Sequence, residues 1–357
     1  TNGFGTEDGA PAADIADGAI NGDDTVSLGI AIATGTNIGI ETHHANIGDG
    51  GNTITVLDTG SITTTGDSTY GIYNDGDDNE TTVSGGITTA GDYAYGIYND
   101  GDISDAGDSE TTVSGSIVTG GDFAFGITNL YGSHKITVSG SIATEGRQAT
   151  GIYNDGNNSE TNVSGSITTA GEESHGIDTE GSNNETIVSG SITTTGDGAY
   201  GIWNYGSNST TTISGNVKAT GANSVALFNA YSTSHLSFTL NEGATIIGDV
   251  LADDGATNSK LIFNLGSYTS YAYSVSGKGA GIGAGQWAFS DLDGRTQGVT
   301  TTGTGCAPIA NAGNDTCNLV TAVGNGNAET QNELQFGTNT SMIGSLSLGG
   351  NTGGSAE

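Results

Sequence analysis

Residues 140–164 form the segment GSIATEGRQATGIYNDGNNSETNVS, and residues 165–189, GSITTAGEESHGIDTEGSNNETIVS, repeat its pattern. The next 25 residues from Gly190, GSITTTGDGAYGIWNYGSNSTTTIS, repeat it again. Further copies begin at Gly60, Gly85 and Gly115. Self-similarity at a fixed period is the signature of a repeat protein, in which each unit stacks on its neighbours.

Three apolar positions recur in every unit, represented by Ile142, Ile152 and Val163 in the first quoted copy. Each lies in a short run rich in threonine and serine, which favours a β-strand. Glycines such as Gly146 and Gly151 separate these runs and mark places where the chain turns. We therefore expect an all-β fold, a parallel β-helix or β-solenoid, with about three short strands in each 25-residue coil.

Stacking the coils in register places equivalent side chains above one another, at about 4.8 Å. We expect one hydrogen-bonded asparagine ladder on the outside of the stack, interrupted by Thr179: Asn74, Asn99, Asn129, Asn154, Asn204 and Asn229. Two aromatic files also arise: Tyr73, Tyr98, Tyr153, Trp203 and Phe228, and Tyr70, Tyr95, Phe125 and Tyr200. The first file is expected to face solvent, where it either contacts a ligand or, as we favour, stacks on itself.

The repeat pattern divides the chain into three segments. Residues 28–265 carry the solenoid repeats, residues 1–27 are expected to be an N-terminal cap or assembly segment, and residues 266–357 a β-rich cap or assembly element. The last segment contains Cys306 and Cys317, with ten residues between them. A pair this close predicts a local disulfide and an oxidising compartment, the alternative being two unrelated thiols.

The charge balance limits the classes of partner. The chain has 40 acidic and 6 basic residues, a formal net charge of −34. Such a chain repels nucleic acid and anionic lipid, so neither is expected to bind. No segment approaches the roughly 20 apolar residues needed for a membrane span. The first residue is Thr1 rather than methionine, and we interpret the chain as processed and secreted, with an extracellular or cell-surface location.

Acidic residues supply the candidate metal ligands. Several lie at alternating positions around one turn and in a five-residue insertion near Ile103, a pattern that suits calcium: Asp75, Asp77, Asp78, Asp100, Asp102, Asp105 and Asp108. They match no established calcium loop, and solvated turns are the alternative. Calcium is the only cofactor that we consider, and we expect no catalytic or other cofactor-binding residues. Arg147 and Arg295 are the only arginines, which disfavours a lyase that needs cationic stabilisers.

The repeats, with the pattern SGSIxTxGDxAxGI, and the segment NEGATIIGDVLADDGATNSKLIFNLG from Asn241 resemble bacterial autotransporter passengers, as does the stretch 267–295. The resemblance implies a right-handed parallel β-helix, exported through an outer-membrane barrel and displayed or released outside the cell. We expect that barrel to be absent, cleaved or carried on another polypeptide.

These observations favour an extracellular structural or adhesive surface protein rather than an enzyme. Because solenoid ends leave unpaired strand edges, we expect head-to-tail assembly with itself into a filament or surface layer. Surface glycans and other cells are further candidate partners. The alternatives are a carbohydrate-active β-helix enzyme, either a lyase or a hydrolase, and a monomeric adhesin passenger.

Overall fold

A computed structural model describes residues 25–35, 38–42, 51–76, 78–101, 108–230, 236–241 and 244–248, together with the bounds of the strands outside these ranges. The chain divides into two compact units, Thr1–Gly181 and Ser182–Glu357. All elements assigned in the described part are β-strands. In that part of the chain no helix is long and apolar enough to cross a membrane.

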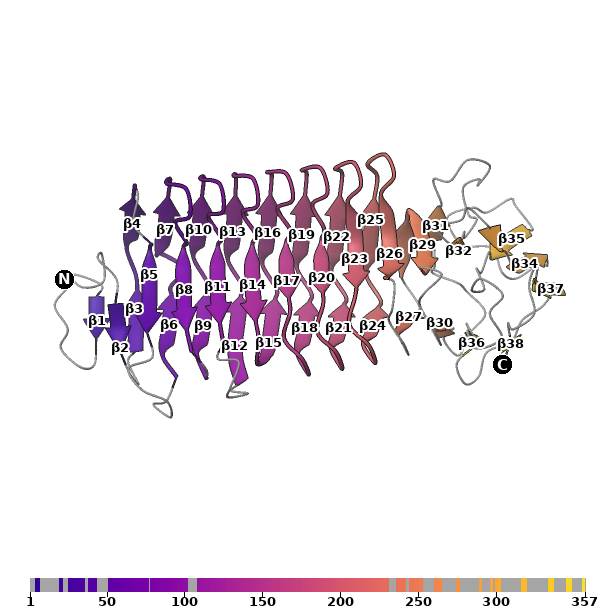
Figure 1. The fold of residues 1–357 in the computed structure, drawn as a ribbon, viewed down its shortest axis with the longest axis horizontal. Helices are drawn as coiled ribbons and strands as arrows, with labels where there is room; N and C mark the ends of the chain where they lie inside the picture. Colours follow the sequence, from indigo (N-terminus) through magenta and orange to yellow (C-terminus); the bar gives the residue numbers. More distant parts are fainter. Residues whose placement is uncertain are drawn as a thin grey trace. The chain divides into compact units, whose positions relative to one another are not determined.

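The first unit contains three sheets, which we name A, B and C (Figure 1). Sheet A has the order β1 (Phe4–Thr6), β3 (Thr25–Leu28), β6 (Thr53–Val56), β9 (Glu80–Val83), β12 (Asp108–Val113), β15 (Ser133–Val138) and β18 (Glu160–Val163). Sheet B has the order β2 (Ala19–Asn21), β5 (Ile40–His43), β8 (Ile72–Asp75), β11 (Ile97–Asp100), β14 (Ile127–Leu130), β17 (Ile152–Asn154) and β20 (Ile177–Thr179). Sheet C has the order β4 (Ala31–Thr34), β7 (Ser61–Thr64), β10 (Gly86–Thr89), β13 (Ser116–Thr119), β16 (Ser141–Thr144) and β19 (Ser166–Thr169).

The second unit continues the same three-strand pattern. One group has the order β21 (Glu185–Val188), β24 (Thr210–Ile213), β27 (Ser237–Asn241), β30 (Lys260–Asn264), β36 (Glu333–Phe336) and β38 (Ser355–Ala356). A second has β23 (Tyr200–Asn204), β26 (Val225–Asn229), β29 (Asp249–Ala252), β32 (Phe289–Ser290) and β33 (Thr296–Gln297), and a third has β22 (Ser191–Thr194), β25 (Asn216–Ala219), β28 (Thr245–Ile247) and β31 (Ser274–Ser276). A separate antiparallel sheet has the order β35 (Thr316–Leu319), β34 (Val299–Thr302) and β37 (Ser345–Leu348).

Each coil pairs in register with the next. In sheet C, Ile87 of β10 lies opposite Ile62 of β7 on one side and Ile117 of β13 on the other, and all three strands are parallel. One turn takes about 25 residues. The predicted all-β parallel solenoid with three short strands per coil is therefore confirmed.

The three apolar files form the core of the solenoid. Equivalent side chains are buried in coil after coil of the first unit: Ile62, Ile87, Ile117, Ile142 and Ile167 in sheet C, Ile72, Ile97, Ile127, Ile152 and Ile177 in sheet B, and Val83, Val113, Val138 and Val163 in sheet A. Successive side chains of a strand point to opposite faces, so each four-residue strand sends two side chains inward. Only one of the two is the apolar position that recurs in every repeat.

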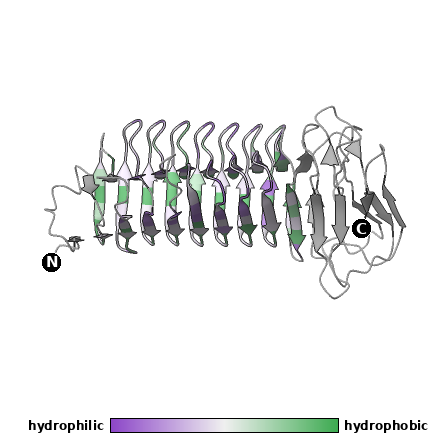
Figure 2. Cartoon of the chain, turned by 60° about the horizontal axis from the view of Figure 1, so that its bottom comes forward, coloured by the Kyte–Doolittle hydropathy of each residue, from purple (hydrophilic) through white to green (hydrophobic). Residues whose placement is uncertain are grey.

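The second inward position is polar in most coils, although in sheet A it is Ile54 in β6 and Ile136 in β15. In sheet C it is a buried threonine, and the Thr64 hydroxyl donates a hydrogen bond to the Thr69 carbonyl, 3.1 Å away. Thr169 does the same with the Ser174 carbonyl at 2.8 Å. Hydrophobic and hydrophilic bands therefore alternate across the described strands (Figure 2). These bonds satisfy hydroxyl groups that are costly to bury alone.

The predicted asparagine ladder is confirmed from Asn74 to Asn129, whose Nδ2 has no partner among the described atoms, but its predicted position on the outside is wrong. Asn74 and Asn99 are 1% and 2% exposed and lie in the interior. The reason is strand alternation: Asn74 is two residues after the inward Ile72, so the two side chains share a face. The Asn74 Nδ2 donates to Asn99 Oδ1, and the Asn99 Nδ2 donates to Asn129 Oδ1, both at 2.6 Å.

Candidate functional site

The outer face of sheet B carries the main concentration of aromatic side chains in the first unit. Tyr73 and Tyr98 lie directly opposite each other on β8 and β11 and are half-buried. Their ring centroids are 5.4 Å apart with the planes 12° from parallel. The second file joins them, because Tyr70 stacks on both Tyr95 and Tyr98 at 5.2 Å. Within the first unit the two predicted files therefore merge into one cluster.

Mutual stacking, the interpretation favoured from the sequence, is confirmed for these four rings. A stacked ring has its faces covered by its neighbours and presents its edge and hydroxyl group outward. Further along, Phe125 stacks on Tyr95 at 5.2 Å and tilts by 41° against Tyr153. A ligand approaching this face therefore meets tyrosine edges rather than open ring faces.

Carboxylates lie directly beside the tyrosine cluster. Asp75 and Asp100 end β8 and β11, face each other in register and are half-buried. The Tyr73 hydroxyl donates a hydrogen bond to Asp100 Oδ2 at 3.2 Å. Burial raises the pKa of Asp100, the Tyr73 hydrogen bond lowers it, and the Asp75 charge raises it further. The pKa of Tyr73 is raised for matching reasons, burial first and then the Asp100 charge.

A second group of carboxylates lies further along sheet B. The Tyr153 hydroxyl donates a hydrogen bond to the Glu180 carboxylate. Burial is the largest effect on Glu180 and raises its pKa. The hydrogen bond from Tyr153 lowers this pKa, and the Asp155 charge raises it. Asp178 lies opposite Tyr153 in the register and is only 7% exposed. Burial, then the charges of Glu180 and Asp155, raises the pKa of Asp178 far above its ordinary value. Its Oδ1 atom has no hydrogen-bond partner among the described atoms.

The structure places four of the seven calcium candidates. Asp75 and Asp100 form the pair on sheet B, while the Asp108 backbone N–H donates to Asp78 Oδ1 at 3.1 Å. The other three, Asp77, Asp102 and Asp105, lie outside the described residues. Within the described ranges, no group of three or more histidine, cysteine, aspartate or glutamate side chains could hold a metal ion.

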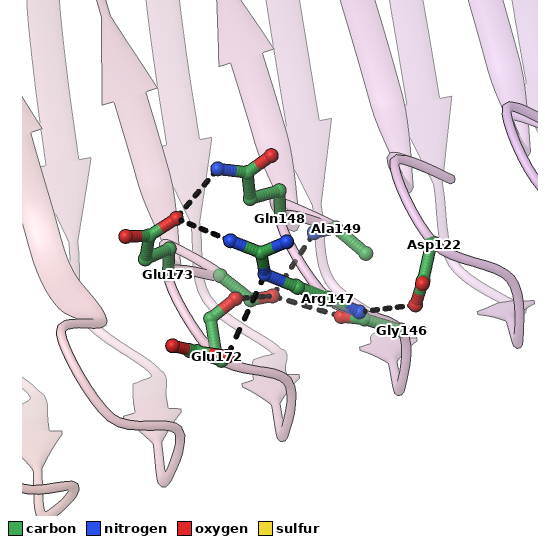
Figure 3. A network of polar contacts seen from close by, with 8 residues as sticks. Asp122, Gly146, Arg147, Gln148, Ala149, Glu172 and Glu173 are labelled. Carbon is green, nitrogen blue, oxygen red and sulfur yellow. Dashed lines mark hydrogen bonds and ion pairs between the residues drawn. The ribbon is translucent and has the colours of Figure 1, made fainter.

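The turns before sheet B carry an aspartate ladder. The Asp92 backbone N–H donates to Asp67 Oδ1 at 3.1 Å, and the Asp122 backbone N–H donates to Asp92 Oδ1 at 2.9 Å. In the next coil Arg147 takes the equivalent place, and its backbone N–H donates to Asp122 Oδ1 at 2.8 Å (Figure 3). These aspartates are exposed, and each one holds the turn of the following coil.

Arg147 also forms ion pairs across the coils. Its Nε lies 3.5 Å from Glu172 Oε2, and its Nη2 lies 3.5 Å from Glu173 Oε2 (Figure 3). On sheet A, Lys135 Nζ lies 2.7 Å from Glu110 Oε1. Lys135 and Arg147 are the one lysine and the one arginine described in the first unit. Both therefore already form ion pairs with glutamates, away from the sheet B carboxylates.

Asn79 and Asn184 each begin an Asn-x-Thr sequence, the acceptor pattern for N-glycosylation, and both are buried. Asn79 and Asn184 are 2% and 3% exposed. The Asn79 side chain donates to the Gly76 carbonyl at 2.8 Å, so a glycan cannot be attached to it in the folded chain. Cys306 and Cys317 lie outside the residues whose side chains are described, and their disulfide stays a prediction.

Comparison with known proteins gives no relative: no family model, no curated protein and no solved structure matches this chain. The fold agrees with a solenoid passenger, and nothing identifies an autotransporter. The sequence did not single out Asp155, Asp178 and Glu180, because only the acidic runs around Asp75 and in the insertion have the alternating spacing that suits calcium. The signal was present, since Asp155 and Glu180 occupy the repeat position of Asp75 and Asp100.

Proposed function

We propose that this chain is an extracellular structural or adhesive surface protein. The observation that carries the proposal is a constant scaffold with a variable surface. The inward isoleucine of sheet B recurs in each coil, whereas the neighbouring position on the outer face varies between the half-buried Tyr98 and Tyr153 and the buried Thr128 and Asp178. Such an arrangement supports display of side chains over many coils, as a surface protein requires.

Self-assembly is part of this proposal. Among the strands that the structure assigns, β4 is the last of sheet C, and it pairs with β7. A terminal strand of a parallel sheet has a row of backbone donors and acceptors that another strand can pair with. We therefore propose that copies of the chain join by strand addition into filaments or layers.

A carbohydrate-active enzyme is the second candidate, and one observation favours it. Asp155 and Glu180 lie in neighbouring coils of sheet B, and neighbouring strands are about 4.8 Å apart. Retaining glycosidases place their two carboxyl groups roughly 5–5.5 Å apart. The raised pKa of Glu180 would suit a general acid.

One set of measurements separates these functions. Beads coated with the purified protein are tested for adhesion to cells and to immobilised glycans, and the free protein is imaged by electron microscopy. The same sample is incubated with polysaccharides, and released sugar ends are counted. Adhesion or filaments without sugar release support the proposal, and sugar release that is abolished by Glu180→Gln supports the enzyme instead. Protein-coated beads that adhere no better than bare beads, with only monomers in the micrographs, would contradict the proposal.

A further inference from the structure

The turn that leads from sheet C to sheet B has an unusual backbone conformation. In five successive coils, one residue of this turn has a positive φ angle between 51° and 56°: Ser68, Tyr93, Phe123, Gln148 and Glu173. Bulky residues are rare in this left-handed region. The turn does not need a ring, because serine, glutamine and glutamate occupy the same place. The fold therefore does not explain why two of the coils carry an aromatic side chain there.

Tyr93 and Phe123 form a stack along the coils. Their ring centroids are 4.8 Å apart, and the ring planes differ by 2°. Backbone hydrogen bonds hold the turns in line, since the Tyr93 N–H donates to the Asp122 carbonyl at 2.8 Å. Phe123 is half-buried, whereas Tyr93 is 48% exposed. Tyr93 is therefore the exposed end of a two-ring stack.

The ring face of Tyr93 that Phe123 does not cover points toward the preceding coil. The Ser68 N–H donates to the Asp92 carbonyl at 2.7 Å, so Ser68 takes the next place in the file. Ser68 is exposed, and its side chain is too small to cover a tyrosine ring. At the other end of the stack, the next place belongs to Gln148, whose Nε2 donates to Glu173 Oε2 at 2.5 Å (Figure 3). The place beside Ser68 is therefore open to a flat ligand about the size of a ring.

Polar groups border this place. Ser68 carries a hydroxyl group, and the preceding Asp67 has an exposed carboxylate. Asp67 Oδ1 accepts one hydrogen bond, from the Asp92 N–H at 3.1 Å, and a carboxylate can accept several more. An aromatic face carries partial negative charge and attracts C–H groups. A pyranose ring matches this combination, because its C–H face packs on an aromatic ring while its hydroxyl groups donate to carboxylates.

The local charge narrows the class of ligand. The exposed Asp67 and Asp92 carboxylates and the net charge of −34 repel an anionic sugar, so a sialylated or uronic acid glycan is disfavoured. An aromatic or proline side chain of another protein can also stack on a tyrosine. Such a side chain lacks the ring of hydroxyl donors that Asp67 can accept from a sugar.

We propose that Tyr93, with Ser68 and Asp67, is a binding site for a neutral saccharide, whose pyranose ring stacks on Tyr93 as the next ring of the file. This inference rests on the proposed adhesive function and names the class of its ligand. The saccharide lies at the exposed turn, away from the carboxylates of sheet B.

The test is surface plasmon resonance of the whole chain over immobilised maltohexaose, cellohexaose, mannohexaose and xylohexaose. Tyr93→Ser, which places the residue of the preceding coil at this turn, should weaken binding by about tenfold, because one stacked ring is lost. Tyr93→Phe keeps the ring and should retain most of the affinity. Ser68→Tyr continues the protein's own stack over the open face and should weaken binding as Tyr93→Ser does.

The matched control is Tyr131→Ser. Tyr131 is 40% exposed and has a φ angle of 56°, so this variant removes an exposed tyrosine with the same backbone conformation from another turn. It should change the affinity by less than about twofold. Circular dichroism of each variant shows that the fold is kept. Equal losses for Tyr93→Ser and Tyr131→Ser would overturn the proposal, as would undetectable binding of the wild type to all of these saccharides.

Light scattering of Tyr93→Ser separates the saccharide from a second copy of the chain. Weaker self-association with unchanged saccharide binding would assign the stack to a contact between copies and overturn the proposal. The outcome is also separate from the proposed function. Cell adhesion by coated beads without any saccharide binding would remove this inference alone, and saccharide binding without cell adhesion would remove the adhesive function instead.

Discussion

At the scale of single residues, glycines in neighbouring coils approach one another too closely to leave room for a Cβ atom. A Cβ atom added at Gly151 would lie 2.6 Å from the Gly176 carbonyl oxygen and 2.4 Å from Ile167 Cγ2. The carbonyl is part of the backbone ladder and cannot move without loss of register. Gly86 differs, since the nearest atom to its added Cβ is Ser116 Oγ at 3.5 Å.

We expect Gly151→Ala to lower the free energy of unfolding by about 1–3 kcal/mol, the usual cost of overpacking. Gly86→Ala is the control and should be neutral or slightly stabilising, because alanine reduces the entropy of the unfolded chain. Thermal unfolding followed by circular dichroism measures both variants. Equal melting temperatures for the two would contradict the close coil spacing at Gly151.

His175 links stability to pH at the same scale. Burial lowers the pKa of His175 to about 4, whereas an exposed imidazole titrates near 6.5. The folded protein therefore binds fewer protons than the unfolded protein between these values. It follows that His175 lowers the free energy of unfolding as the pH falls from about 6.5 to 4, by up to about 3 kcal/mol.

The buried Asp178 has a raised pKa and acts in the opposite direction, so the wild-type profile alone does not isolate His175. The comparison needed is with His175→Thr, which places the residue found at Thr150 in the preceding coil. Urea unfolding at a series of pH values should show the wild type losing stability relative to this variant as the solution is acidified. Parallel profiles for the two proteins would count against a buried neutral imidazole.

At the scale of the elements, sheet B depends on its interior asparagine ladder. Asn99 accepts a hydrogen bond from Asn74 and donates to both Asn129 and Thr111. Asn99→Ala leaves these partners buried without it, which should cost about 2–4 kcal/mol. Asn99→Thr should cost less, since Thr42 already bonds Asn74 Oδ1 in this ladder at 3.3 Å. Denaturant titration measures the free energy of unfolding of both variants. Equal losses for Asn99→Ala and Asn99→Thr would contradict the role of the ladder.

At the scale of the whole molecule, assembly is a balance of charge repulsion and strand pairing. The net charge of −34 repels over about 30 Å at 0.01 M salt and over about 8 Å at 0.15 M. Strand pairing is short-ranged and contributes roughly 0.5–1.5 kcal/mol for each hydrogen bond. Sodium chloride should therefore promote assembly, as light scattering will show, and a protein that stays monomeric at every salt concentration would exclude strand addition.

Calcium chloride at matched ionic strength extends the salt experiment. If the predicted aspartates bind calcium, assembly should increase more than ionic strength explains. The variant Asp75→Asn, Asp78→Asn, Asp100→Asn, Asp108→Asn should abolish that excess and leave the sodium response. Equal responses to the two salts in the wild type would rule out only the calcium sites.

The sequence by itself determined the solenoid, because a 25-residue period with three in-phase apolar positions such as Ile142, Ile152 and Val163 has few other solutions. It also showed that equivalent residues stack, since the period fixes which side chains are neighbours. Tertiary structure decided which face each ladder occupies. Asn74 is interior because it lies two residues after the inward Ile72 in the same strand, so the two side chains point to the same face. Which residues share a face depends on where each strand begins and ends, and the composition does not mark these ends. The merging of the two tyrosine files and the desolvation of Asp100, Asp155 and Asp178 likewise depend on distances between coils, which exist only in the folded chain.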